Sequence, residues 1–406
     1  MNKRIFFGLS GGLGPVLRSL PIADKFRQAG DFVSFSVYGD SSASFIKKQG
    51  YSHLDDDDPV MPSEEKLLPP SPVFYDLDHY YAAAGLLDEA FAESWVRHRI
   101  SMLEKAGADL AVADMSPHTV IAARYLGIPV VSITQACFHP YGEPMYAWGD
   151  APRNLPRVTP VINKILAKLR LPAIRSMEEL NLGDLDLVPG IPETDPISHP
   201  GVCYVGQLAH KIDAPRPAWI EKLGVEPYVL VYPGRLRDSS GSSGLRLLQS
   251  VYEAFGGTDL PVVVASQEPL PKAFRKRQYR NIRAIPYFTE ELLEACALFI
   301  HHGGHGSCLS SIMAGVPSLI VPTQTEREYN ARKVYELGIG EYMLPGAFTA
   351  EHLRGLARYM MHDDYALKAR KLRNAVLIRG YGGAEEAYDA CRRLLTSTLK
   401  AGGDGL

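Results

Sequence analysis

The residues with the clearest chemical potential form a glycine-rich loop that holds three histidines, His301–Ser307. The loop follows a short apolar run, Leu298–Ile300, and precedes Leu309, Ile312 and Met313, which share one face of a helix. The spacing therefore predicts a loop that leads into a helix N-terminus. Unpaired amides and the positive end of the helix dipole favour an anion there, such as a pyrophosphate, and a histidine adds a hydrogen bond or a charge.

Other titratable or aromatic side chains are candidates for acid–base chemistry or for stacking. His118 and His139 follow predicted strand ends on the same side of a predicted sheet, although surface or core histidines would leave the same pattern. Aromatic residues cluster in three segments, which could stack on a planar acceptor or act as lid or core aromatics: 74–75, 79–81 and 141–146.

Two successive α/β units must position these residues. In the first, an apolar run at Ile5–Phe7 is followed by glycines, a helical pattern that ends near Gly30, and a strand at Phe32–Val37. The second begins near Pro227, and its first strand also leads into a glycine turn. The remaining predicted strands are 110–113, 129–133, 228–232, 261–265, 298–300 and 319–321. Strand–helix–strand units of this kind build parallel sheets.

Composition limits the protein class. The 406 residues include 46% hydrophobic and 22% charged residues with a net charge of -3, which predicts about two globular domains and disfavours a nucleic-acid binder. Five scattered cysteines indicate reduced thiols, and no apolar stretch approaches the ~20 residues of a membrane span. We expect a soluble cytoplasmic protein. The acidic run Asp55–Asp58 is interpreted as a solvated loop rather than a metal site.

A longer ordered series extends from the histidine loop. It comprises His302–Ser307, Ala314–Pro317, Pro322, Glu326–Arg327, Asn330–Ala331, Glu336–Gly338 and Gly340. This series resembles family 1 (UDP-type) GT-B glycosyltransferases of the bacterial natural-product type. The N-terminal glycine loop and residues 122–129 are similar to the acceptor-binding half of that family.

The resemblance implies an α/β GT-B fold, in which two facing Rossmann-like domains with parallel sheets enclose a deep interdomain cleft. It implies an acceptor-binding domain at 1–207, a linker at 208–226 and a nucleotide-sugar-binding domain at 227–385. A C-terminal helix and tail, 386–406, are expected to pack back toward the N-terminal domain.

The resemblance also implies site residues. The predicted donor-binding residues are Gly12, Gly14, Gly234, Arg235, Phe288, His302, Gly304, Gly306, Ser307, Ser310, Glu326 and Arg327. The predicted acceptor-binding residues are Tyr75, His79, Tyr80 and Tyr141. His301 is expected to be structural and His305 to lie near the cleft.

The chain departs from the family pattern at several positions. Pro15 stands where the family usually places its catalytic histidine, and Arg18 stands where a family proline is common. Ser310 replaces the ribose-binding glutamate, which resembles enzymes that use dTDP-deoxysugars. Arg327 replaces a common glutamine.

Without the histidine, the proton acceptor is open. Asp114 occupies the place of the acid that orients that histidine, so it becomes a catalytic candidate beside His118 and His139; a helix-N-terminal acid is the alternative. An acceptor that is an amine or is already ionised would need no base.

We therefore expect an inverting, metal-independent hexosyltransferase that moves a sugar from a UDP- or dTDP-sugar to a small natural-product acceptor, without the family histidine base. The nucleotide-sugar is a co-substrate, so no cofactor is expected, and no nucleic-acid partner; a homodimer is compatible with the sequence. The alternatives are a non-catalytic GT-B nucleotide-binding or auxiliary protein, or a sugar-nucleotide epimerase or hydrolase. A dinucleotide oxidoreductase is disfavoured because Leu17 stands where the fingerprint needs its third glycine.

Overall fold

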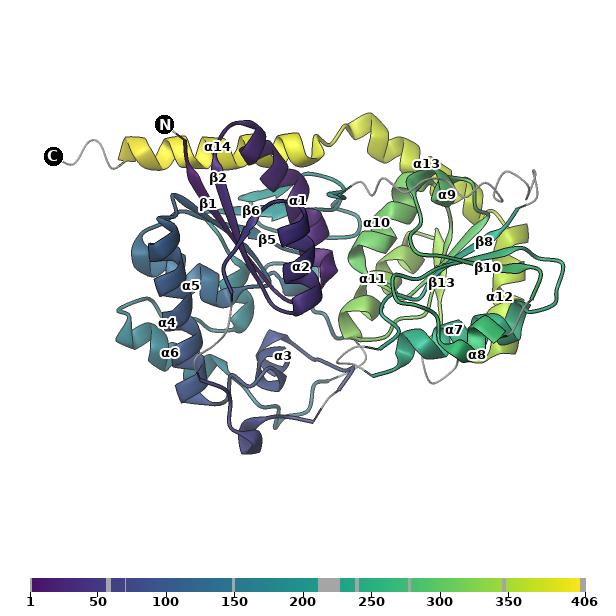
Figure 1. Cartoon of the computed structure of the whole chain (residues 1–406), viewed down its shortest axis with the longest axis horizontal. Coiled ribbons are helices and arrows are strands. Elements are labelled where there is room, and N and C mark those ends of the chain that lie inside the picture. Colours follow the sequence, from purple (N-terminus) through teal and green to yellow (C-terminus); the bar gives the residue numbers. More distant parts are fainter. Residues whose placement is uncertain are drawn as a thin grey trace. The chain divides into compact units, whose positions relative to one another are not determined.

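The computed structural model (Figure 1) describes residues 2–55, 60–69, 71–147, 150–210, 227–237, 241–276, 279–344 and 348–401, with side chains to 397. The chain divides into two compact units: unit 1 comprises Met1–Pro69, Tyr75–His210 and Tyr381–Leu406, and unit 2 comprises Pro70–Phe74 and Lys211–Gly380. Residues 70–74 and 381–385 thus cluster with the opposite half from the one that the sequence analysis assigned. Asp56–Asp58 of the acidic run and most of the predicted linker, 211–226, lie outside the described residues.

Unit 1 is built on a parallel sheet. Its strands are β1 (Arg4–Leu9), β2 (Phe32–Val37), β3 (Ser52–His53), β4 (Leu110–Asp114), β5 (Val130–Ile133), β6 (Leu185–Val188) and β7 (Val202–Tyr204). Their spatial order in the described part is β3-β2-β1-β4-β5-β6-β7, all in parallel register. The strand order reverses between β1 and β4, which makes their carboxyl ends the topological switch point of a Rossmann-type sheet.

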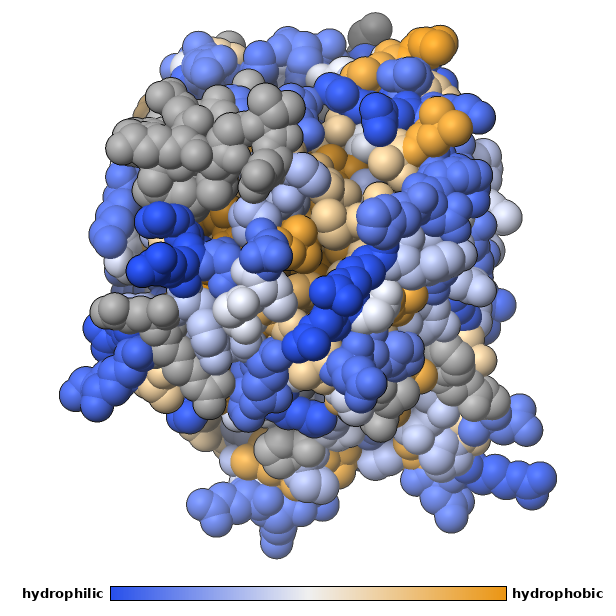
Figure 2. Space-filling view, turned by 90° about the vertical axis from the view of Figure 1, so that its right-hand side faces the viewer, coloured by the Kyte–Doolittle hydropathy of each residue, from blue (hydrophilic) through white to orange (hydrophobic). Residues whose placement is uncertain are grey.

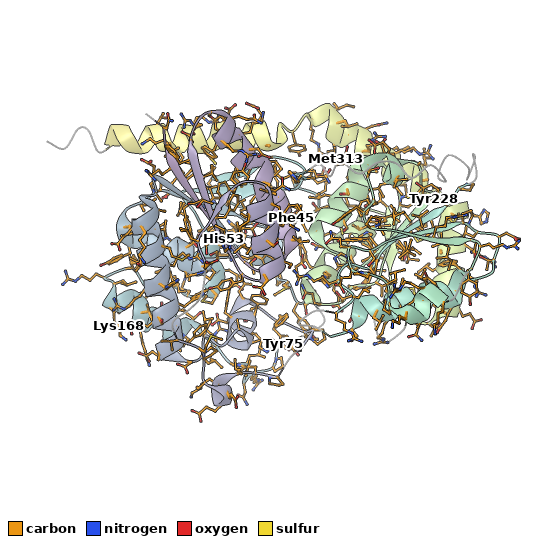
Figure 3. All side chains as sticks on the ribbon, in the orientation of Figure 1. Phe45, His53, Tyr75, Lys168, Tyr228 and Met313 are labelled. Atoms are coloured by element: carbon orange, nitrogen blue, oxygen red, sulfur yellow. The ribbon has the colours of Figure 1, made fainter. Side chains whose placement is uncertain are left out.

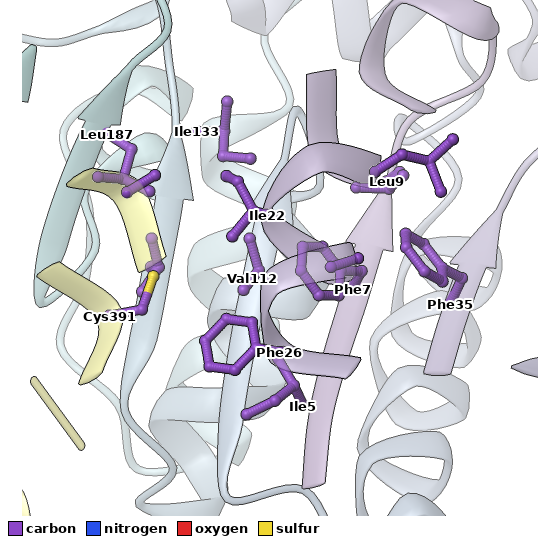
Figure 4. Close-up of a cluster of buried hydrophobic side chains, with 14 of the residues drawn as sticks. Ile5, Phe7, Leu9, Ile22, Phe26, Phe35, Val112, Ile133, Leu187 and Cys391 are labelled. Atoms are coloured by element: carbon purple, nitrogen blue, oxygen red, sulfur yellow. The ribbon is translucent and has the colours of Figure 1, made fainter. Parts of the chain in front are cut away.

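Helices cover this sheet. They are α1 (Leu13–Gln28), α2 (Asp40–Lys48), α3 (Leu77–Ala83), α4 (Glu89–Ala106), α5 (Pro117–Leu126), α6 (Thr159–Lys168) and α14 (Gly383–Ala401), with 3-10 turns at Glu64–Lys66, Ala136–Phe138 and Met177–Asn181. Figure 4 shows how the core forms: Phe7 on β1 and Phe26 on α1 pack in one buried cluster with Cys391 on α14. The last helix of the chain therefore completes the core of the N-terminal unit.

Unit 2 repeats the architecture. Its strands are β8 (Val229–Tyr232), β9 (Val262–Ala265), β10 (Ile282–Ile285), β11 (Leu298–His301), β12 (Ser318–Ile320) and β13 (Gly340–Tyr342). They lie in the order β10-β9-β8-β11-β12-β13, again parallel throughout the described residues. This is the Rossmann order, with the switch point between β8 and β11.

The helices of unit 2 bury both faces of its sheet. They are α7 (Ser243–Phe255), α8 (Lys272–Lys276), α9 (Glu290–Glu294), α10 (His305–Ala314), α11 (Thr325–Glu336), α12 (Ala350–His362) and α13 (Tyr365–Arg379). Val229 and Val231 belong to one apolar cluster, whereas Tyr228 and Leu230 belong to another. Because side chains alternate along a strand, this division shows that β8 is covered on both sides, which explains its continuous apolar sequence.

Figure 2 shows one face that is hydrophilic over most of its outer part, with hydrophobic residues gathered toward its centre. The most exposed large hydrophobic residue among those described is Ile378, at 86%, next to Leu377 at 53%. Exposed apolar side chains are ordinary on protein surfaces. None of the described helices combines the length and apolar character needed to traverse a lipid bilayer.

Candidate functional site

The glycine-rich loop of unit 2 lies at the switch point of its sheet. β8 ends at Tyr232, two residues before Gly234, and β11 ends at His301, immediately before His302. Helix α10 then begins after Gly304, with no side-chain cap, and its first intrahelical hydrogen bond joins Cys308 N–H to Gly304 O at 3.1 Å. The amides of residues 305–307 precede that bond, so they are the helix donors that an anion would engage.

His302 is buried between two close backbone segments. A side chain at Gly234, where φ is +72°, would place its Cβ 2.9 Å from Cγ of His302, and one at Gly304 would place it 2.7 Å from Nε2. Glycine is therefore required on both sides of the ring. The Nδ1 atom of His302 is buried and makes no hydrogen bond among the described residues, although the Tyr232 carbonyl is near enough to influence its pKa. Burial, with Arg327, holds the pKa of His302 well below its usual value, so the ring is neutral.

His301 fixes the loop from within. Its Nδ1 accepts a hydrogen bond from the Gly303 amide at 3.1 Å, which leaves Nε2 as the donor to Ser318 Oγ, also at 3.1 Å. Burial lowers the pKa of His301 to about 3. Both ring nitrogens are used inside the fold, as expected for a structural histidine.

A second polar group begins after β12 and continues into α11. Oε1 of Glu326 accepts from Asn330 Nδ2 at 2.7 Å, and Oε2 accepts from Gln324 Nε2 at 3.4 Å. Asn330 Nδ2 also donates to the carbonyl of Gly303 at 3.0 Å, and Arg327 donates to Thr323 Oγ1. Asn330 thereby joins the carboxylate of Glu326 to the glycine-rich loop.

The other predicted donor residues are distributed unevenly. Phe288 packs against Tyr232, with ring centroids 5.4 Å apart, Ser310 is half-buried on α10, and Arg235 is exposed beyond β8. Gly306 is exposed on the first turn of α10, with open space where a side chain would begin. Ser307 is buried in the same turn.

Gly12 and Gly14, by contrast, lie in the β1–α1 region of unit 1, so the structure divides the predicted donor residues between the two units.

At the switch point of unit 1, Asp114 forms an ion pair that the sequence analysis missed. Arg18 on α1 donates from Nε and Nη2 to the two carboxylate oxygens of Asp114, each at 2.5 Å, and the Asp114 side chain is completely buried. The next residue, Met115, has a φ of +48°, a strained value for a residue with a side chain. Asp114 is therefore a carboxylate held by a permanent cation.

His118 belongs to a buried polar cluster. Its Nε2 accepts from Arg99 Nη2 at 2.7 Å, its Nδ1 lies 3.2 Å from Ser116 Oγ, and its ring stacks on Trp95 at a centroid distance of 3.8 Å. Because a guanidinium can only donate, the proton of the neutral ring is on Nδ1. The basic nitrogen of His118 is occupied.

His139 is held by a different network. Its Nδ1 accepts from the Tyr141 amide at 3.2 Å, so its Nε2 donates to Asp186 Oδ2 at 3.3 Å. His139, Asp186 and His199 bring potential metal ligands within 4.8 Å of one another. The tautomer fixed by Tyr141 N–H leaves no lone pair on Nε2 for a metal, so the hydrogen bonds favour a structural role.

The predicted acceptor residues form separate aromatic groups. Tyr75 (Figure 3) lies 4.5 Å from Tyr146 and 5.6 Å from His79, measured between ring centroids. Burial lowers the pKa of His79, which keeps the ring neutral. Tyr80 packs edge-on against Tyr81 at 5.1 Å.

Tyr141 is in another group, stacked on His199 at 4.9 Å. The structure therefore brings Tyr75 and His79 together but gives Tyr141 a different neighbour.

The fold defines a class of protein. The structure of CalG4, the calicheamicin glycosyltransferase, superposes with a TM-score of 0.71 at 20% identity and covers 97% of this chain and 98% of that one. The spinosyn forosaminyltransferase SpnP superposes equally well, with a TM-score of 0.71, 20% identity and coverage of 98% and 100%. The chain has the GT-B fold of two Rossmann-like domains, as the sequence predicted.

Sequence relatives narrow the class. Residues 251–381 match the family described as erythromycin biosynthesis protein CIII-like, C-terminal domain. NDP-glycosyltransferase YjiC of Bacillus licheniformis is 34% identical over 151 residues, 35% of this chain and 36% of the relative. Demethyllactenocin mycarosyltransferase of Streptomyces fradiae is 34% identical over 107 residues, 26% of this chain and 23% of the relative. The matched segments thus span about a third or less of these relatives, and they confirm the resemblance to glycosyltransferases of antibiotic pathways.

Proposed function

We propose that this protein is a glycosyltransferase that moves a sugar from a nucleoside-diphosphate donor, UDP- or dTDP-linked, to a small natural-product acceptor. The observation that carries the proposal is the loop His302–Ser307. It leads into α10 at the switch point of the unit 2 sheet, inside the segment that matches the erythromycin-type family. Ligands of open α/β sheets bind at this position.

The donor diphosphate would be bound by the amides at the start of α10 and by the neutral ring of His302. In an inverting transfer, the acceptor attacks the anomeric carbon from the face opposite the diphosphate, and the bond from that carbon to the diphosphate oxygen breaks. The helix N-terminus and the His302 N–H would stabilise the charge that develops on the leaving group. In this mechanism protein groups, rather than a metal ion, would stabilise the leaving group.

The acceptor must also lose a proton if its attacking atom is a neutral hydroxyl. Both oxygens of Asp114 accept from Arg18, His118 Nε2 accepts from Arg99, and His139 is held between Tyr141 and Asp186. We infer that none of these three side chains is the general base. The acceptor would then be one whose attacking atom is already ionised at neutral pH, such as a carboxylate or an acidic phenol.

A non-catalytic nucleotide-binding protein is the second candidate. The Arg18–Asp114 ion pair favours it, because Asp114 stands at the place of the acid that orients the family's catalytic histidine but is paired here with an arginine. Turnover distinguishes the two candidates: both would bind nucleotide, but only the transferase would consume donor when an acceptor is present.

Thermal-shift titration with UDP, dTDP and NAD tests the donor site. A nucleotide at 100 times its dissociation constant adds about 2.7 kcal/mol to the unfolding free energy. We expect UDP or dTDP to raise Tm, His302→Ala to abolish the shift, and His352→Ala, an exposed histidine of unit 2, to retain it. A wild-type protein that no nucleoside diphosphate stabilises would contradict the proposal.

A panel of phenols of decreasing pKa then tests the acceptor. We expect kcat/KM to rise with pH along the ionisation of each phenol, and aliphatic alcohols to be poor acceptors. A pH midpoint that is the same for every acceptor would instead reveal a base on the protein.

A further inference from the structure

A short segment from the N-terminal half of the chain is hydrogen-bonded within unit 2. The carbonyl of Pro72 accepts from the Thr325 amide at 3.1 Å and from Thr325 Oγ1 at 3.3 Å, while the Phe74 amide donates to Thr325 Oγ1 at 2.9 Å. The hydroxyl of Thr325 is thus both donor and acceptor in this contact. We refer to Ser71–Phe74 as the 71–74 segment.

The segment has an internal order of its own. Ser71 Oγ accepts from the Val73 amide at 3.0 Å and lies 3.2 Å from the Val73 carbonyl, to which it donates. Pro72 and Val73 are exposed, whereas Thr325 is buried at 2% exposure. A compact turn on the surface of unit 2 is therefore hydrogen-bonded to a buried residue.

Thr325 stands at a critical place in unit 2. It is the first residue of α11, directly between Gln324 and Glu326, whose side chains hydrogen-bond to each other. The Glu326 carboxylate is joined through Asn330 to the glycine-rich loop. A shift of Thr325 would therefore move the two polar residues beside it.

We propose that the 71–74 segment is part of the donor-sugar site and that Thr325 is a positioning residue. The segment fixes the start of α11, so that Gln324 and Glu326 present their polar groups to the hydroxyls of the transferred sugar. Its hydrogen bonds to Thr325 place it beside Gln324 and Glu326, so we assign it to the sugar rather than to the nucleotide. This inference rests on the proposed function.

Thr325→Val tests the role of Thr325, because valine keeps the branched shape and removes only the hydroxyl. Isothermal titration would compare the nucleoside diphosphate that stabilises the wild type with the corresponding nucleotide-glucose. We expect the nucleoside diphosphate Kd to stay within twofold. The nucleotide-sugar Kd should rise about tenfold, the effect of losing one hydrogen bond between the protein and the sugar. In steady-state kinetics, donor KM should rise more than kcat falls.

Two further variants keep the test decisive. Ser71→Ala loosens the segment without touching α11 and should weaken nucleotide-sugar binding selectively but less. Thr349→Val removes an equivalent hydroxyl from the N-cap of α12, where it accepts from the His352 amide, and should leave both affinities unchanged.

The outcomes distinguish the role of the 71–74 segment from the proposed function itself. Equal weakening of both ligands by Thr325→Val, or no weakening of either, would overturn the role of the segment while leaving nucleotide binding established. A wild-type protein that binds no nucleoside diphosphate would overturn the proposed function, and this inference with it.

Discussion

Arg18 and Asp114 form a bidentate ion pair at the carboxyl end of β4, with both N–O distances at 2.5 Å. The pair lies at the switch point of the unit 1 sheet, and the Asp114 carboxylate is fully buried. Since a guanidinium does not lose its proton at accessible pH, Arg18 holds both oxygens of Asp114 without being able to relay a proton.

Removal of Arg18 should destabilise unit 1 strongly. Arg18→Met would leave a buried, unpaired carboxylate, which costs about 3–5 kcal/mol. We expect urea unfolding to show a loss of this size. In the double variant Arg18→Met/Asp114→Leu most of it should be recovered, because no buried charge remains. A double variant as unstable as the single one would show that the arginine contributes through packing instead.

The two neighbouring histidines of unit 2 should make its stability depend on pH. Burial lowers the pKa of His301 to about 3 and that of His302 well below normal, whereas in the unfolded chain both should titrate near 6.5. Stability is therefore fully present above pH 6.5 and falls as the pH drops toward about 3, because the unfolded state binds the protons first. Each histidine can contribute up to about 1.4 kcal/mol per pH unit.

Urea unfolding followed by circular dichroism from pH 7.5 to 5 measures this dependence. In His301→Asn, the amide oxygen can still accept from the Gly303 amide but does not titrate. The unfolding free energy of this variant should change with pH by about 1.4 kcal/mol per pH unit less than that of the wild type. Identical slopes would exclude His301 as a source of the pH dependence.

A methyl group at Gly234 should disrupt the packing of the His302 ring in the glycine-rich loop. Gly234→Ala would force alanine into a positive φ and bring its Cβ within 2.9 Å of the His302 ring. We expect a loss of about 1–3 kcal/mol in stability and of the nucleotide-induced thermal shift.

Gly355→Ala is the matched control, because its Cβ would meet nothing within 4 Å in the middle of α12. It should stabilise unit 2 by about 0.5–1 kcal/mol and keep nucleotide binding. If Gly234→Ala bound nucleotide normally, the close approach to His302 would not be needed for the site.

Asn330 should be needed for the arrangement of Glu326. Asn330→Ala removes the hydrogen bonds to Glu326 Oε1 and to the Gly303 carbonyl. At about 1 kcal/mol for each neutral bond and more for the charged one, affinity for the nucleotide-sugar should fall at least tenfold. Calorimetry with and without the sugar moiety measures the effect, and an unchanged nucleotide-sugar Kd would exclude this role.

The sequence predicted the parts of the fold that local patterns encode. The run 32–37 coincides with β2, and the glycine loop after Leu298–Ile300 leads into α10 as expected. The strands β3, β6, β7, β10 and β13 were not predicted. Two or three residues carry no measurable periodicity, and Asp186 in β6 and Arg283 in β10 interrupt the apolar run.

The contacts within the site were harder to foresee. Asp114 was identified as a candidate, but its partner Arg18 lies 96 residues away, and the sequence gives no sign that they meet. The contact of the 71–74 segment with Thr325 spans about 250 residues and depends largely on backbone groups, which every sequence supplies.

The return of α14 to unit 1 has a consequence for hybrid proteins. Ala387, Ala390, Cys391 and Leu395 of this helix belong to the same buried cluster as β1 and α1. Recombination at a single breakpoint between the two halves would therefore place a helix from one parent against a sheet from the other. Exchange of whole units between homologues needs a second breakpoint near residue 380, so that the N-terminal half is inherited together with its last helix.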